Sequence, residues 1–148
     1  NGTLNDRLEI RDQGPGVGNV SLSGTDVRYD FGIGPEVIGT FVGDSTGLDP
    51  LVITLDADSD DPSVEALMRN ITYRNISDDP STLARTVRFV LTDGDGGTSN
   101  AETETINVTA MNDAPVVTAP GSALSATEQT ILSIDGMGFS VVDSDSGG

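Results

Sequence analysis

Short runs of alternating apolar and polar residues, separated by turn-forming residues, recur along this chain and limit its fold most strongly. A period of two places apolar side chains on one face of a β-strand, and Gly, Asp and Ser between the runs favour turns. The runs cover residues 20–22, 27–29, 37–42, 51–53, 86–91 and 103–109. Many short strands with Gly and Asp turns between them predict an Ig-like β-sandwich.

Residues 61–71 depart from this pattern and predict one short helix. Asp61 is an N-cap candidate, and Pro62 suits the first helical position, where no backbone donor is needed. Helical spacing would form one apolar face from Val64, Leu67 and Ile71. We expect this helix to lie on the edge or end of the sandwich.

The composition limits both the core and the location of the chain. The 148 residues include four Phe, two Tyr and no Trp, and 35% are hydrophobic. The core should therefore be thin and made of Val, Ile, Leu and Ala. No stretch approaches the roughly 18 consecutive apolar residues of a membrane span, so we expect no membrane insertion. The sequence shows no signal peptide, and we expect a soluble piece of a longer protein.

Residue types that catalysis often requires are missing. The chain has no Cys, no His and no Lys, and all seven basic residues are Arg. These absences exclude Ser-His-Asp and Cys-His catalysis, Schiff-base chemistry and imidazole-bound zinc. Carboxylate-pair glycoside hydrolysis remains, but the few scattered aromatic residues provide no sugar platform. We expect that the protein is not an enzyme.

Acidic residues outnumber basic residues by 24 to 7, which gives a net charge of −17. Phosphate contacts need clusters of Lys and Arg, so this charge argues strongly against nucleic acid and anionic membranes as partners. The acidic residues are 18 Asp and 6 Glu. Asp suits turns and supplies oxygen ligands for hard cations. Composition alone leaves two interpretations open, a cation-binding chain and an acidic surface that maintains solubility.

Two acidic clusters lie in predicted loops of the first two thirds of the chain. Residues 56–61 do not form an EF-hand loop, because the sixth position is Asp61 where Gly is required. Asp93 and Asp95 alternate with Gly in the loop between two predicted strands. A hairpin turn and a metal site are both open interpretations of this second cluster.

Two further clusters follow near the end of the chain. Asn112 and Asp113 precede Pro115 between two predicted strands. Asp143 and Asp145 form a D-x-D pattern, which allows two carboxylates to point toward one ion. Alone this pattern is a weak signal, and its weight comes from the Asn-Asp pair about thirty residues earlier.

The combination of these patterns resembles a known family. Residues 64–121 contain most of a short predicted helix, followed by "ITYRN", "LTDGDGGTS" and "NDAPV". This combination resembles the cadherin-like tandem repeats of large bacterial surface proteins, RTX-type adhesins among them. Residues 1–63 resemble the strand-rich first half of such repeats more loosely. The resemblance implies an all-β fold, an Ig-like or cadherin-like Greek-key β-sandwich with one short helix.

The resemblance also implies how the chain is divided. Residues 1–111 would be a cadherin-like sandwich repeat that lacks its opening strands. Residues 112–115 would be the linker between repeats. Residues 116–148 would be the opening strands and the calcium loop of the following repeat.

In cadherin-type joints, Ca²⁺ is held by the linker, by a D-x-D loop and by acidic residues near strand ends. Carried over to this chain, the resemblance implies metal ligands at Asp93, Asp95, Asn112, Asp113, Glu128, Asp143 and Asp145. Asp93 would serve the joint at the opposite end of its repeat. Ala110 stands where the vertebrate signature has an acidic residue, so we expect fewer ions than in a full cadherin joint.

The implied function is mechanical. Such a chain would be a calcium-stiffened spacer in an extracellular adhesin or surface fibre of a bacterium, and its partners would be neighbouring repeats of the same protein. A calcium-dependent carbohydrate-binding module for cell-surface polysaccharide is one alternative, with candidate contacts at Tyr29, Phe31, Phe41 and Tyr73. In another, residues 116–148 supply strands to a neighbouring copy, and a head-to-tail filament forms.

Overall fold

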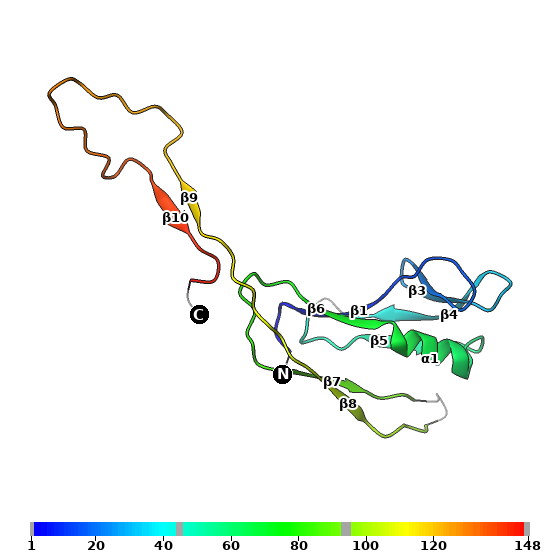
Figure 1. Ribbon diagram of the computed structural model, residues 1–148. Helices are drawn as coiled ribbons and strands as arrows, with labels where there is room; N and C mark the ends of the chain where they lie inside the picture. The colour runs from blue at the N-terminus through cyan, green and yellow to red at the C-terminus, as the bar shows by residue number, and fades with distance from the viewer. Residues whose placement is uncertain (1, 44–45, 93–95, 147–148) are drawn as a thin grey trace.

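The computed structural model describes residues 2–43, 46–92 and 96–146, and it has the predicted all-β, sandwich-like fold (Figure 1). Its sheets are antiparallel, and the described residues contain one short helix. The elements in chain order are β1 (Asp6–Ile10), β2 (Val20–Ser23), β3 (Asp26–Asp30), β4 (Pro35–Val42), β5 (Val52–Leu55), α1 (Asp61–Arg69), β6 (Ile71–Asn75), β7 (Arg85–Phe89), β8 (Glu102–Ile106), β9 (Val116–Thr118) and β10 (Ser140–Val142).

The strands form one larger sheet and three pairs. The larger sheet has the order β2-β3-β4-β5, while β1 pairs with β6, β7 with β8, and β9 with β10. The β3–β4 ladder shifts register between Val27 and Arg28. Gly39 lies in β4 at this irregularity, and an added Cβ would come 2.3 Å from the Thr54 carbonyl oxygen of β5. Glycine therefore allows the close approach of β5 to the sheet.

The core is small and aliphatic, as the composition predicts. Its buried apolar residues come from the first four strands and the helix, and they are Ile10, Val20, Val27, Ile38 and Leu67. Tyr29 and Phe41 pack against this cluster and remain partly exposed. We call residues 2–43, 46–92 and 96–106 the body, and the core lies within it.

The helix has its N-cap one position earlier than the sequence predicts. Asp60 is the N-cap, and its carboxylate accepts a hydrogen bond from the Ser63 backbone N–H at 3.0 Å. The Asp60 N–H donates to the Ser63 hydroxyl at 2.9 Å, which completes a capping box. The predicted N-cap at Asp61 is wrong, because Asp60 makes both capping hydrogen bonds with Ser63. Ile71 is not on the helix face and begins β6.

A buried ion pair joins β1, β6 and β7 within the body. Asp6 accepts hydrogen bonds from Arg85 Nε at 2.8 Å, Tyr73 Oη at 2.5 Å and Asn75 Nδ2 at 2.7 Å. The Thr3 N–H donates to the same carboxylate at 2.6 Å. Burial alone would raise the pKa of Asp6, but these hydrogen bonds outweigh burial and hold the pKa well below its usual value. The charge of Asp6 is therefore fully compensated.

Residues 116–142 form a hairpin, called here the arm, that extends away from the body (Figure 1). Residues 107–115 connect the arm to β8, which ends at Ile106. The predicted strand 103–109 is thus too long, because β7 begins at Arg85 and its pairing with Ile106 closes the ladder. Within the described residues, no helix is long and apolar enough to cross a membrane.

Candidate cation site at the linker

The register of the arm brings the linker and the D-x-D pattern together. Val116 pairs with Val142 in the antiparallel β9–β10 ladder. The residues just before Val116 and just after Val142 therefore leave the ladder at the same end. The Asp113 N–H donates a hydrogen bond to Asp145 Oδ2 at 3.0 Å, across 32 positions of sequence. We call Asn112, Asp113, Asp143 and Asp145 the linker corner.

Local hydrogen bonds shape both sides of the linker corner. Asn112 Nδ2 donates to the Asp113 carbonyl oxygen at 2.8 Å. The Ser146 hydroxyl donates to the Asp143 carbonyl oxygen at 3.2 Å. The second contact closes the turn that carries Asp143 and Asp145.

The electrostatics of the linker corner favour a cation. The pKa of Asp143 is raised, first because its protonated carboxyl group hydrogen-bonds the carboxylate of Asp145, and then by burial and by the negative charges of Asp145 and Asp113. Asp143 Oδ1 is buried and has no hydrogen-bond partner among the described residues. A cation would relieve the repulsion and give this oxygen a partner.

Of the other predicted ligands, Glu128 does not join the linker corner. Glu128 lies in the 119–139 connection, at the opposite end of the β9–β10 ladder, and its carbonyl oxygen accepts a hydrogen bond from Thr130 Oγ1 at 3.5 Å. Asp93 and Asp95 lie outside the described residues. Across residues 2–43, 46–92 and 96–146, no group of three or more acidic side chains is arranged to hold a metal ion.

The four aromatic residues considered for carbohydrate contact all contact other residues of the fold. Tyr73 donates its hydroxyl hydrogen to Asp6, and Phe41 packs against the core. Tyr29 and Phe31 stack edge to face, with ring centroids 4.8 Å apart and an interplanar angle of 78°. Each ring thus has a contact within the fold, and Tyr29 and Phe31 lie together.

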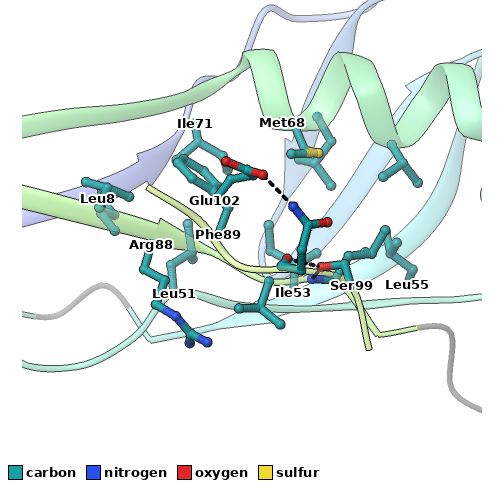
Figure 2. A pocket seen from close by; sticks show the side chains of 16 residues that line it. Leu8, Leu51, Ile53, Leu55, Met68, Ile71, Arg88, Phe89, Ser99 and Glu102 are labelled. Atoms are coloured by element: carbon teal, nitrogen blue, oxygen red, sulfur yellow. Dashed lines mark hydrogen bonds between the residues drawn. The ribbon is translucent and has the colours of Figure 1, made fainter. Parts of the chain in front are cut away.

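An apolar groove in the body was not predicted from the sequence. It has a volume of about 370 Å³ and lies between β5 and α1 on one side and the β7–β8 hairpin on the other. Met68 projects from α1 into the groove, and Ile53 and Leu55 of β5 line it as well (Figure 2). Phe89 of β7 lines the facing wall, while Glu102 adds a carboxylate that bonds Asn100.

Comparison with known proteins identified no relative of this chain. No family model, no curated protein and no solved structure matches the chain. Function is therefore inferred from the linker corner, from the groove and from the sequence patterns described above.

Proposed function

We propose that this chain is a structural repeat of an extracellular bacterial adhesin or surface fibre, and that Ca²⁺ bound at the linker corner stiffens it. The observation that supports the proposal most directly is the contact between Asp113 and Asp145 beside the buried, unpaired Oδ1 of Asp143. The acidic composition and the resemblance to cadherin-like repeats support the same function.

The donor set of the linker corner suits Ca²⁺ better than softer metals. Ca²⁺ binds about six to eight oxygen ligands, which include carboxylates, amide and backbone carbonyls, and water. Asp113, Asp143 and Asp145 would supply carboxylates, and Asn112 would supply an amide or backbone oxygen. Carbonyl and water oxygens can complete such a shell, so it does not need three converging acidic side chains. The chain has no Cys or His for a soft metal.

An ion at the linker corner would tie the linker to the turn that follows β10. Short linkers between sandwich units normally allow relative motion. An ion that draws oxygens from the linker and from the turn after β10 would restrict this motion. At free Ca²⁺ about ten times the Kd, each ion would stabilise the bound form by about 1.4 kcal/mol. Extracellular modules typically have a Kd of about 0.1–1 mM, so the joint would respond to extracellular Ca²⁺.

Equilibrium binding of Ca²⁺ to a charge-neutralised variant tests this function. We expect the unmodified chain to bind Ca²⁺ in the millimolar range and to bind Mg²⁺ much more weakly. The double variant Asp143→Asn and Asp145→Asn should lose this binding. Asp56→Asn with Asp58→Asn is the matched control, because these exposed residues have the same D-x-D spacing in a different loop.

Two results would contradict the proposal. One is the absence of Ca²⁺ binding by the unmodified chain at millimolar concentrations. The other is an equal loss of binding in the corner variant and in the control, which would make the effect one of general acidity. Titration calorimetry or dialysis with radioactive calcium measures both.

A further inference from the structure

The chain exposes far more surface than a compact protein of its size. Its accessible surface is 10162 Å² for 15.3 kDa. A compact monomer of this mass exposes about 7,100 Å², so the excess is about 3,000 Å². Obligate protein interfaces bury about 2,000–5,000 Å² in total. The excess is comparable to the area that one such interface buries.

The arm provides one half of such an interface. Its four strand valines, Val116, Val117, Val141 and Val142, are 62% to 68% exposed. Val117 pairs with Val141 on one face of the hairpin, and Val116 pairs with Val142 on the other. A two-stranded hairpin that is apolar on both faces has little stability alone, and both faces need cover.

The groove provides the other half. Among the described residues, β5 pairs only with β4, so its second edge is open. Ile53 and Leu55 are partly buried and line the groove, whereas Val52 and Thr54 of the same strand are exposed. A strand added along this edge would place alternate side chains in the groove beside Met68.

We propose that the arm of a second copy of this chain occupies the groove, with β10 added along the open edge of β5. Phe139 and Val141 are on one side of the extended segment at β10 and would enter the groove together. The donor and acceptor surfaces are different parts of the chain, so the contact is not self-complementary. Repetition of such a contact joins copies head to tail.

This contact does not require an ion at the linker corner. The linker corner lies beyond the Val142 end of β10, and the groove is lined by residues of the body. Loss of Ca²⁺ binding would therefore leave the arm–groove contact in place. The two proposals can fail separately.

Site-directed crosslinking between two single-cysteine variants tests the contact, because the chain has no native cysteine. One variant carries Met68→Cys in the groove, where Met68 is 50% exposed, and the other carries Val141→Cys in the arm. Mixed and treated with a short bis-maleimide in the presence of chelator, they should form the heterodimer at several times the yield of either homodimer. Thr105→Cys on exposed β8 replaces the arm variant as the control.

Light scattering on the unmodified chain provides the second measurement. The mean mass should rise with concentration beyond that of a monomer. Val117→Asp with Val141→Asp should return the chain to a monomer, whereas Thr130→Asp with Ser133→Asp adds the same charge to exposed positions and should leave assembly intact. Circular dichroism confirms that each variant is folded.

Two outcomes would overturn the proposal. One is a monomer at every concentration together with a heterodimer yield no higher than the Thr105→Cys control. The other is equal loss of assembly in both aspartate double variants, because copies would then associate through something other than the arm valines.

Discussion

The body and the arm contain similar aliphatic residues, but only the body buries them. Ile38 of β4 is fully buried among residues of other strands, whereas Ile131 of the arm is 95% exposed. None of the described residues from 116 to 146 is buried. In the body, Ile10 of β1 and Leu67 of α1 pack against the larger sheet, whereas the arm has only its own two strands. Apolar residues at strand spacing therefore form a core only where another layer covers them.

We expect the largest loss of unfolding free energy when the buried ion pair of the body is removed. Arg85→Met leaves the Asp6 carboxylate buried without its partner and should cost about 3–5 kcal/mol of unfolding free energy. Arg69→Met is the control, because its pair with Glu65 is exposed and should contribute about 0.3–0.5 kcal/mol. Urea unfolding measures both. Similar midpoints for the two variants would show that the ion pair does not hold β7 to β1.

The same substitution in each region tests the comparison directly. Ile38→Ala should cost about 2–5 kcal/mol, because it removes core contacts and leaves a cavity. Ile131→Ala should change the unfolding free energy by less than about 0.5 kcal/mol in dilute monomer. Urea unfolding at low protein concentration makes the measurement. A large cost at Ile131 would mean that the arm is packed within the monomer.

Asp6 of the body and Asp143 of the linker corner should affect the pH dependence of stability in opposite directions. The lowered pKa of Asp6 stabilises the fold above its unfolded pKa near 3.8, and this contribution is lost as the pH falls toward the folded pKa. The raised pKa of Asp143 has the opposite sign, since protonation relieves repulsion at the linker corner and this benefit is lost as the pH rises.

Unfolding free energies between pH 7 and pH 2 measure the Asp6 contribution. We expect a decrease below about pH 4, where the unfolded Asp6 begins to bind a proton. Asp6→Asn should weaken this decrease, whereas Asp12→Asn, at an exposed loop position, should leave it unchanged. An identical acid profile for Asp6→Asn and the unmodified chain would contradict the role given to Asp6.

We expect the smallest loss of unfolding free energy from substitutions at the N-terminus of α1. Asp60→Ala removes the side-chain half of the capping box and should cost about 1 kcal/mol. Asp61→Ala, one position later, should cost less because Asp61 contributes only its charge near the helix N-terminus. Thermal unfolding of the two variants orders them. A larger cost at Asp61 would restore the cap that the sequence predicts.

Local patterns predicted the strands that alternate clearly and missed those defined by distant partners. The runs at 20–22, 27–29 and 37–42 became β2, β3 and β4. β1 was not predicted, because its inward Asp6 is polar and is satisfied only by residues of β6 and β7. Contacts across 67 and 79 positions have no signature in a local window.

The candidate sites were predictable to different degrees. The resemblance placed Asp113 and Asp145 in one joint, and the antiparallel register of β9 and β10 brings them into contact. Glu128 has the residue type of a ligand, but its place in the 119–139 connection depends on chain geometry beyond the motif. The groove arises where an open strand edge meets a separate hairpin, and no residue pattern marks such a gap.

The hydrogen bond between Asp113 and Asp145 determines how the arm would respond to force. Both chain segments leave the β9–β10 ladder at the Val116–Val142 end, so tension applied through them would peel the strands apart from that end. The Asp113–Asp145 contact lies at the point where the peeling would start and would rupture first. The strength of this contact would therefore determine the force at which β9 and β10 separate.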